Sequence, residues 1–318
     1  MTETMPGPAE KNAHAVTGAF GFSGKYLARR LLDAGERVVT LTNSPQRPDP
    51  FAGAVEARPL DFGDVKALSA SLADVSVLYN TYWVRFKHPR FSYTQAVRNT
   101  LTLLEAARAA GVERVVHVSI ANADTESPWD YFSAKGHLEK ALAASGLNYA
   151  VLRPAVLFGP EDILINNIAW ALRRFPVFGL FGDGEYFIRP IHVDDMAALM
   201  AEQGKSREIA TVNALGPEDL RYKDIVALIA DALGKKRRYV RLSPKAALMA
   251  CKAIGLLVDD VFVSEDEITA LMAGMLHVPG AEAAGGAALS TWVREQSADI
   301  GRVYHAEMDR RTDRSKAY

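Results

Sequence analysis

The chain has 318 residues, enough for one large domain or two closely joined domains with an apolar core of their own. Its composition is 49% hydrophobic and 24% charged, with a net charge of −1, which is typical of a soluble globular protein. This balance gives no electrostatic reason to expect binding to nucleic acid or to an anionic membrane. The single cysteine, Cys251, excludes an internal disulfide and favours a reducing compartment, and we expect it to be a small buried hydrophobe.

The N-terminal segment is polar and contains proline and glycine, so we expect residues 1–12 to be a flexible tail rather than a signal peptide. No stretch approaches the about 20 apolar residues that a membrane-spanning helix needs. The nearest candidate, Ala246–Val263, is interrupted by Lys252, Asp259 and Asp260, which indicates an amphipathic helix. The expected location is therefore the cytoplasm, with no membrane partner.

Short apolar segments alternate with helical segments through the first half of the chain. The expected strands are Ala13–Val16, Arg37–Thr42, Val55–Leu60, Val75–Asn80, Val115–Ser119 and Tyr149–Pro154. The expected helices between them are Gly24–Ala34, Val65–Ala73, Ser92–Ala110 and Phe132–Ser145. Strands and helices that alternate this regularly predict an α/β protein with a Rossmann-type, doubly wound parallel sheet over residues 13–160.

After Gly159-Pro160 the alternation is lost. Helices are expected at Ile163–Arg174, Val193–Gln203, Tyr222–Leu233, Lys245–Leu257 and Ser264–Met275. The loops between them are rich in glycine, proline and charge. This pattern predicts a smaller, mostly helical substrate domain over residues 161–318, interleaved with late strands of the sheet.

A glycine-rich turn, Thr17-Gly-Ala-Phe-Gly-Phe-Ser-Gly24, follows the first strand and opens the first helix. Gly18 would form the tight turn, Gly21 would leave room for phosphates, and Gly24 would let helix and strand pack closely. The neighbouring Phe20 and Phe22 would also border a bound dinucleotide. The alternative is a purely structural turn.

The choice between NAD and NADP stays open. A carboxylate after the second strand would bind the ribose 2′-hydroxyl of NAD, but the strand ends in Thr42-Asn43-Ser44. Arg47 follows and could contact a 2′-phosphate, or it could be a solvated loop residue. Asp61 and Phe62, after the third strand, are placed to contact the adenine.

Tyr131 and Lys135 lie one helical turn apart, on the same face of an expected helix. A free tyrosine has a pKa near 10, and a nearby ammonium should lower that pKa toward the working range. Tyr131 could then exchange a proton with a substrate oxygen while the nicotinamide exchanges a hydride. The alternative is an ordinary solvated helix face.

With these motifs the sequence resembles the short-chain dehydrogenase/reductase superfamily, in its extended and atypical branches of the epimerase/dehydratase type. The resemblance covers roughly residues 12–240, and the tail is similar to the complex I 39-kDa accessory-subunit group. Besides the glycine turn and the Tyr–Lys pair, it is carried by Asp61-Phe62, Asn80-Thr81, Asn99, Leu152-Arg153-Pro154, Phe158-Gly159-Pro160, Gly182-Asp183-Gly184, Ile191–Asp195 and Leu289–Trp292.

The resemblance implies a role for three side chains in catalysis. Tyr131 would be the acid–base group, Lys135 would also bind the nicotinamide ribose, and Ser119 would polarise the substrate oxygen. Ser119 could instead be a strand-end hydroxyl that satisfies the backbone. Asn80, Thr81, Tyr82 and Pro154 match positions that border the cofactor. Tyr131 comes only twelve positions after Ser119, which is the spacing of compact members and makes sugar-nucleotide chemistry less favoured.

Aromatic residues gather where the substrate is expected. Tyr82, Trp83 and Trp129 are the proposed pocket residues, because planar rings suit a flat apolar ligand, and Arg189 is a further substrate contact. We expect Trp170, Phe175 and Phe178 to belong to the core, His192 to be structural, and Asp194 and Asp195 to cap a helix.

These features predict an NAD(P)-dependent oxidoreductase acting at a carbonyl, hydroxyl or quinone-like group of a small, aromatic molecule. A tailoring step of bacterial secondary metabolism would fit. The alternatives are an epimerase or dehydratase that holds NAD tightly and acts on a sugar-like substrate, and a non-catalytic NAD(P)-binding module. We expect no metal site and no nucleic-acid partner, and a homodimer is possible.

Overall fold

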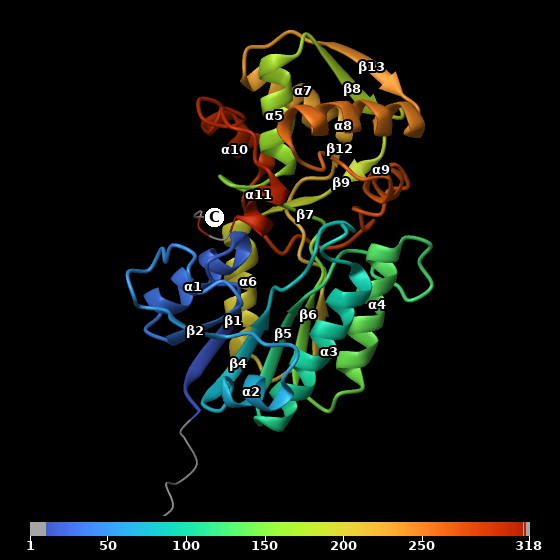
Figure 1. Cartoon of the computed structure of the whole chain (residues 1–318). Helices are drawn as coiled ribbons and strands as arrows, with labels where there is room; N and C mark the ends of the chain where they lie inside the picture. Colours follow the sequence, from blue (N-terminus) through green and yellow to red (C-terminus); the bar gives the residue numbers. More distant parts are fainter. Residues whose placement is uncertain (1–10, 314, 316–318) are drawn as a thin grey trace, which may run out of the picture.

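The computed structural model describes residues 11–313 and residue 315. The tail expected at residues 1–12 therefore lies almost wholly outside the described residues. Two lobes are stacked along the long axis of the molecule (Figure 1), with a parallel sheet in one lobe and a group of helices in the other. The domain boundary expected at residue 160 stays a prediction.

The first lobe is built on a seven-stranded parallel sheet with the order β11-β6-β5-β4-β1-β2-β3. Its strands are β1 (Ala13–Thr17), β2 (Arg37–Thr42), β3 (Glu56–Pro59), β4 (Val75–Asn80), β5 (Arg114–Val118), β6 (Tyr149–Leu152) and β11 (Ala210–Val212). The order reverses between β1 and β4, as in doubly wound sheets that bind nucleotides at this point. The predicted fold class is confirmed.

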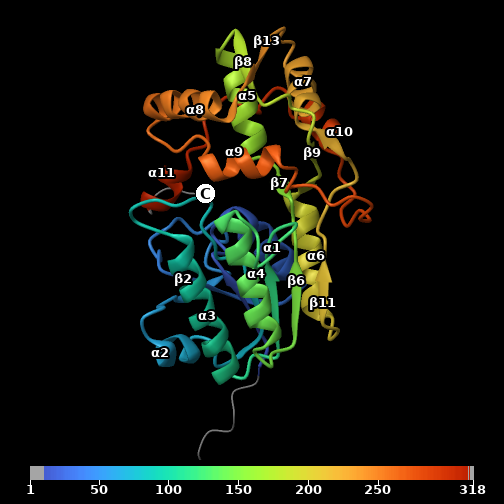
Figure 2. The same ribbon diagram turned by 90° about the vertical axis from the view of Figure 1, so that its right-hand side faces the viewer.

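Helices cover both faces of the sheet, because the central strands are buried along most of their length and carry apolar side chains on both sides. One face packs against α1 (Phe22–Asp33) and α6 (Val193–Lys205), and the other against α2 (Val65–Ala70), α3 (Tyr93–Ala109) and α4 (Asp130–Ala143). α6 and β11 follow the first part of the second lobe in sequence and then return to the sheet (Figure 2). The sheet lobe is therefore complete only at residue 212.

The second lobe contains the helices α5 (Leu164–Arg174), α7 (Tyr222–Ala232), α8 (Pro244–Val258), α9 (Glu265–Met272), α10 (Leu289–Glu295) and α11 (Glu307–Thr312). Three short strand pairs accompany them: β7 (Val156–Phe158) with β10 (Pro190–His192), β8 (Val177–Phe181) with β13 (Arg238–Leu242), and β9 (Phe187–Ile188) with β12 (Leu220–Arg221). Sequence analysis predicted the longer helices to within a few residues, but it predicted neither these strand pairs nor α11.

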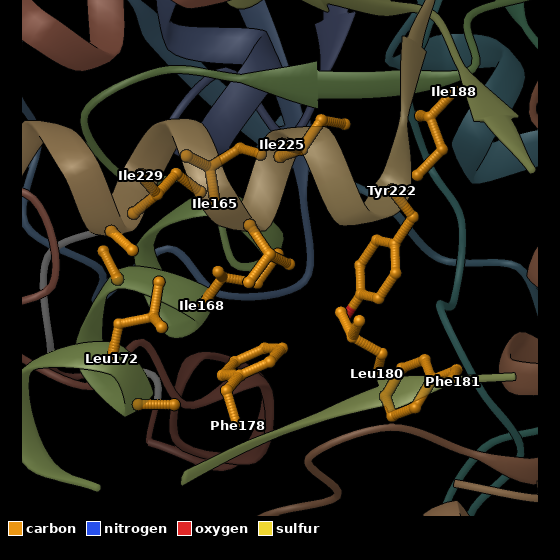
Figure 3. Close-up of a cluster of buried hydrophobic side chains, with 14 of the residues drawn as sticks. Ile165, Ile168, Leu172, Phe178, Leu180, Phe181, Ile188, Tyr222, Ile225 and Ile229 are labelled. Atoms are coloured by element: carbon orange, nitrogen blue, oxygen red, sulfur yellow. The ribbon is translucent and has the colours of Figure 1, made fainter. Parts of the chain in front are cut away.

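The core of the second lobe forms where α5, α7 and β8 meet (Figure 3). Tyr222 at the start of α7 stacks on the ring of Phe181, with a centroid distance of 5.6 Å, and on that of Tyr186 at 5.5 Å. Trp170 and Phe178 are buried, as expected, and so is Cys251. Within the described part of the chain, no helix has both the length and the hydropathy needed to cross a membrane.

Candidate cofactor and active site

Two cavities meet at the carboxyl ends of the parallel strands, where ligands bind in sheets of this type. The first, which we call the cofactor cavity, has a volume of about 770 Å³ and follows the glycine turn. The second, the apolar cavity, has a volume of about 720 Å³ and runs into the second lobe. Tyr131 and Trp83 line both, so the two cavities share a wall at these side chains.

The glycine turn has the backbone geometry that the sequence predicted. Gly18 has a φ of +74°, a conformation that glycine adopts without strain. A Cβ atom on Gly24 would lie 2.2 Å from the carbonyl oxygen of Gly18, so only glycine allows α1 to pack this closely on the turn. Among residues 11–313, no side chain caps the helix at Gly21 and no acidic residue lies in the first turn of α1. The N–H groups at this end are therefore available to a pyrophosphate.

Most of the residues predicted to contact the cofactor line the cofactor cavity. They are Gly18, Phe20, Gly21, Phe22, Asn43, Arg47, Thr81 and Tyr82. Lys135 and Pro154 line the apolar cavity instead.

Three predicted cofactor residues are not in the lining of the cofactor cavity. Asn80 is fully buried, where its side-chain oxygen accepts hydrogen bonds from the Thr17 hydroxyl at 3.3 Å and the Tyr82 N–H at 3.1 Å. Phe62 packs on the Tyr82 ring with a centroid distance of 5.0 Å. Asp61 is exposed and accepts a hydrogen bond from the N–H of Gly63. Asn80 and Phe62 thus support Tyr82, and the direct cofactor contacts predicted for Asn80, Asp61 and Phe62 stay predictions.

The C-terminal helix α11 forms part of the wall of the cofactor cavity, which sequence analysis missed. Glu307, Arg310 and Arg311 all line this cavity. The Arg47 guanidinium donates a hydrogen bond to the carbonyl oxygen of Arg310 at 2.7 Å, and Arg311 donates one to the carbonyl oxygen of Trp83 at 3.3 Å. α11 therefore joins the loop after β2 to the loop after β4.

Lys135 is buried in α4 beneath the ring of Trp83. Its Nζ donates a hydrogen bond to the carbonyl oxygen of Val118 at 2.7 Å and lies 4.1 Å from the centroid of the Trp83 ring. Burial lowers the pKa of Lys135 to about 7, against an opposing effect of Glu139. Within the described residues the buried indole N–H of Trp83 has no hydrogen-bond partner, so the ring is held only by packing.

Tyr131 lies among aromatic rings, edge-on to Tyr93 at 5.6 Å and to Trp83 at 5.8 Å. Burial raises the pKa of Tyr131, Glu267 raises it further, and Arg311 and Arg85 act in the opposite direction. The expectation that Lys135 lowers this pKa does not hold in this geometry, because the ammonium is directed at Val118 and Trp83. The phenol is therefore protonated at neutral pH.

Ser119 lines the apolar cavity, but its hydroxyl donates a hydrogen bond to the carboxylate of Glu139. Glu139 also accepts a hydrogen bond from Nε of Arg153 at 3.0 Å. Sequence analysis missed Glu139, although its place four residues after Lys135 puts it on the same helix face. The hydroxyl of Ser119 is thus oriented by a carboxylate rather than toward Tyr131.

The predicted substrate residues separate into two groups. Trp83 and Trp129 line the apolar cavity, and the Trp129 indole is fixed by a 3.0 Å hydrogen bond to the hydroxyl of Thr269. Tyr82 lines only the cofactor cavity, where its hydroxyl accepts a hydrogen bond from Asn99 at 2.8 Å. Arg189 lines neither cavity, so its assignment as a substrate contact stays a prediction without support from this geometry. It is buried and donates hydrogen bonds to the carbonyl oxygens of two loop residues, Gly216 and Ala281.

The residues at the start of α6 are structural. His192 is the helix cap, since its Nδ1 accepts a hydrogen bond from the N–H of Asp194 at 3.3 Å. The expected capping by the two aspartates was wrong. Asp194 forms an ion pair with Arg30 of α1, and Asp195 accepts a hydrogen bond from the N–H of Ala287 at 2.8 Å. These contacts hold α6 against α1 and the later chain.

The apolar cavity extends from Tyr131 between α5, β8, α8 and α9. Its far end is lined by Val177, Phe178, Leu242 and Ile254. Near Tyr131 its polar lining includes an ion pair between Arg85 and Glu267, with a separation of 2.8 Å. Neither residue was selected from the sequence, because they are distant in the chain and belong to no motif.

Comparisons with known proteins agree with this geometry. A family model described as NAD(P)H-binding matches residues 18–167. The chain is 26% identical over 253 residues to NADH dehydrogenase (ubiquinone) 1 alpha subcomplex subunit 9 of Arabidopsis thaliana, a match that covers 74% of this chain and 61% of that subunit. It is 29% identical over 252 residues to quinone oxidoreductase 2 of Escherichia coli, covering 76% of this chain and 82% of that protein.

Solved structures show the same fold. The NADPH complex of the Escherichia coli quinone oxidoreductase aligns with a TM-score of 0.67 and 24% identity, over 84% of this chain and 92% of that one. A nucleoside-diphosphate-sugar epimerase from Staphylococcus aureus aligns with a TM-score of 0.66 and 16% identity, over 92% of this chain and 98% of that one. Residues 18–167 therefore match a model of NAD(P)H-binding proteins, and the chain has the same fold as these two solved structures.

Proposed function

We propose that the chain is an NAD(P)-dependent oxidoreductase that acts at a carbonyl, hydroxyl or quinone-like group of a small apolar molecule. The observation that carries the proposal is the position of Tyr131 on the wall shared by the cofactor cavity and the apolar cavity. A proton donor at this boundary can contact a substrate in one cavity and a nicotinamide in the other. The quinone oxidoreductase among the relatives supports the same class of reaction.

The bound cofactor supplies the hydride to the substrate carbon in reduction and accepts it in oxidation. In reduction, Tyr131 donates its phenolic proton to the substrate oxygen as the C=O bond becomes a C–OH group, and the phenol then regains a proton from solvent. The raised pKa of Tyr131 keeps this proton in place until a substrate arrives. The rings of Trp83, Trp129 and Tyr93 exclude water from the reacting atoms.

Trp83 acts as a movable cover in this proposal. Its indole occupies the position above Lys135 that the family resemblance assigns to the nicotinamide ribose. The indole N–H has no hydrogen-bond partner among the described residues. A movement of the indole away from Lys135 would therefore break no hydrogen bond of the Trp83 side chain. Lys135 would then exchange its contact with the ring for hydrogen bonds to ribose hydroxyls.

The decisive experiment replaces Tyr131 with phenylalanine. We expect NAD(P)H to bind with an affinity within about threefold of the wild type, because the phenol makes no contact in the pyrophosphate turn. The rate of NAD(P)H oxidation with quinones and aromatic carbonyls should fall by about 10² to 10⁴, the usual contribution of a general acid. Binding is measured by fluorescence titration and the rate by cofactor absorbance.

Since β2 ends without a carboxylate and Arg47 lines the cavity, NADPH should bind more tightly than NADH.

Tyr93→Phe is the matched control, since it removes the hydroxyl of a neighbouring ring that donates a hydrogen bond to the Arg85 carbonyl oxygen at 3.0 Å. We expect its turnover to stay within a few-fold of the wild type. An unchanged rate in Tyr131→Phe would refute the assigned role of Tyr131.

A non-catalytic NAD(P)-binding module is the second candidate. Two observations favour it: the Ser119 hydroxyl is directed to Glu139, and Trp83 covers Lys135. This candidate predicts cofactor binding by the wild type and no oxidation of NAD(P)H with any acceptor. The epimerase alternative instead predicts a tightly held NAD and conversion of a sugar-like substrate without net cofactor turnover.

A further inference from the structure

Positive charge is concentrated in one short part of the chain. Residues 235–258 contain seven basic residues and no acidic residue, in a chain whose net charge is −1. The remainder of the chain therefore carries a net charge of −8. The basic residues are Lys235, Lys236, Arg237, Arg238, Arg241, Lys245 and Lys252.

Helix α8 presents apolar side chains to solvent within this basic segment. Leu256 is 88% exposed, Leu257 75% and Met249 66%. Lys245, Met249, Lys252 and Leu256 follow one another at helical spacings of four, three and four, so lysine and apolar side chains alternate along one stripe. The outward face of a helix in a globular protein is normally polar, whereas this face carries large apolar side chains between its lysines.

The exposed apolar side chains of the molecule cluster at this place. Of the ten large hydrophobic side chains exposed among the described residues, six belong to α8, β8 or β13. The other four lie apart from these elements in the sequence, as single exposed apolar residues commonly do. The six are Val177, Tyr239, Val240, Met249, Leu256 and Leu257.

We define the α8 face by five exposed side chains of this helix, which are Lys245, Met249, Lys252, Leu256 and Leu257. The exposed cations Lys236, Arg238 and Arg241 lie in or just before the neighbouring strand β13. Within residues 11–313, none of these five lysine and arginine side chains forms an ion pair with a carboxylate. α8 and the β8–β13 ribbon lie at the end of the second lobe that is farthest from the parallel sheet (Figures 1 and 2).

The apolar cavity reaches the same elements. Its lining includes Val177 of β8, Leu242 of β13, and Ala250 and Ile254 of α8. Val177 is 45% exposed and Ala250 is also exposed, so this end of the cavity approaches the surface beside the α8 face. The other end is at Tyr131. A molecule that enters here would pass between mostly apolar walls before it meets the ion pair of Arg85 and Glu267 and the proton donor Tyr131.

We infer that the α8 face docks on a membrane surface that contains anionic lipids, and that the apolar cavity takes its substrate from the bilayer. The second half of this inference rests on the proposed oxidoreductase function. Met249, Leu256 and Leu257 insert among the lipid chains, while the lysine and arginine side chains extend to the anionic headgroups. The substrate class is then a lipid-soluble molecule with a carbonyl or quinone group. The near-zero net charge of the whole chain conceals this face, which is why composition alone argued against a membrane.

Charge favours a membrane over a second copy of the chain as the occupant. A symmetric dimer through the α8 face would bring Lys245 and Lys252 of both copies together. No carboxylate belongs to the face to neutralise them. An anionic lipid surface supplies the missing negative charge.

The binding test uses the full chain and vesicles of phosphatidylcholine with and without phosphatidylglycerol. We expect the wild type to float with the anionic vesicles and to be released by raised salt. Lys245→Gln combined with Lys252→Gln should lower the partition coefficient by about fivefold for each lysine removed. Leu256→Glu combined with Leu257→Glu should lower it by more than about tenfold.

Ile209→Glu combined with Val303→Glu is the matched control. These side chains are 62% and 68% exposed, and they lie outside α8, β8 and β13. This variant should float like the wild type. The docking proposal is overturned if the wild type does not bind anionic vesicles, or if the α8 and control variants lose binding equally. It is also overturned if the wild type is a dimer without lipid and the Leu256/Leu257 variant is a monomer.

A second readout separates the two halves of the inference. With a short-chain, water-soluble quinone, the Leu256/Leu257 variant should turn over like the wild type. With a long-chain quinone dissolved in anionic vesicles, its turnover should fall in proportion to its binding. Equal loss on both quinones would overturn uptake from the bilayer. If the wild type reduces neither quinone but still binds vesicles, the proposed function fails and the docking surface stands.

Discussion

At the scale of single residues, Lys135 is the most unusual group in the site. The residue is 2% exposed, and its ammonium contacts the carbonyl oxygen of Val118 and the face of the Trp83 ring. A buried cation without a close carboxylate is costly, and this cost appears as a pKa lowered to about 7 by burial. A cofactor-binding site can retain this destabilising group, because hydrogen bonds to a bound ribose would stabilise the buried ammonium.

We predict that Lys135→Met makes the folded protein more stable at neutral pH. The pKa of Lys135 is about 7 in the folded chain against 10.5 for an unperturbed lysine, so between these values the unfolded chain binds more protons. The free energy of unfolding of the wild type should therefore rise as the pH increases from about 7 to about 10.5. Lys135→Met should lack this rise and exceed the wild type by roughly 2–4 kcal/mol at pH 7. Urea unfolding at both ends of the pH range measures the difference.

The control for this prediction is Lys140→Met, an exposed lysine of the same helix. Its pH profile should follow the wild type. A Lys135→Met protein that is less stable than the wild type at pH 7 would contradict the assigned burial cost.

At the scale of secondary-structure elements, α11 connects parts of the site that are far apart in sequence. Its first N–H groups, from Glu307 and Met308, donate hydrogen bonds to the carboxylate of Asp260 at 2.9 and 3.0 Å. Its side chains line the cofactor cavity, and both figures of the whole chain place it between the two lobes (Figures 1 and 2). The helix thus closes one side of the cofactor cavity with residues from the end of the chain.

We predict that a chain ending at His305, which lacks α11, binds NAD(P)H at least about tenfold more weakly than the full chain. The deletion removes Arg310 and Arg311 from the wall of the cavity and frees Trp83 and Arg47 from their contacts with the helix. A chain ending at Thr312, which keeps α11, is the control and should bind like the full chain. Fluorescence titration compares the three, and equal affinities would show that α11 takes no part in binding.

The sequence predicted the elements of the parallel sheet well, because their signals are local. β4 (Val75–Asn80) and β2 (Arg37–Thr42) have the predicted bounds, since a buried parallel strand is a short apolar run between polar ends. α11 carried no such signal, because the carboxylate that caps it comes from Asp260. The β8–β13 pair was missed for a similar reason, since Tyr239 and its arginine neighbours acquire a partner only in the folded chain.

Some features of the candidate site could also be predicted from local sequence, and others depend on the packing of distant elements. The spacing of Gly18 and Gly24, and of Tyr131 and Lys135, could be read from the chain because each pair lies within one turn or helix. The cover of Trp83 over Lys135 and the hydrogen bond from Ser119 to Glu139 depend on how separate elements pack. The hydrogen bonds of Arg189 could not be predicted for this reason, since only the folded loops bring two carbonyl oxygens to its side chain.

At the scale of the whole molecule, the sheet lobe depends on chain that comes after the start of the second lobe. α6 covers the sheet beside α1, and the ion pair from Asp194 to Arg30 joins the two helices. β11 occupies the outer edge of β6. Residues 13–160 therefore lack α6, which covers part of one face of the sheet, and β11, which protects one edge.

We predict that a fragment of residues 1–160 aggregates when expressed alone, since an open strand edge and an uncovered apolar face both promote association. Co-expression with residues 161–318 should restore a soluble complex, because that fragment supplies α6 and β11. Size-exclusion chromatography of both preparations measures the outcome. A monomeric 1–160 fragment that binds NAD(P)H would contradict this dependence and would establish the first lobe as a domain of its own.

β11 is synthesised long after β6, the strand it pairs with, and this delay affects folding on the ribosome. Leu152 ends β6, and Ala210, 58 residues later, begins the strand that pairs with it. At ordinary elongation rates, roughly 3 to 12 seconds pass between the synthesis of these two strands. During this interval β6 can pair with β5, but its outer edge has no partner. The protein should therefore need a chaperone at the exit tunnel more than its size suggests, and slow codons between these strands should reduce its yield.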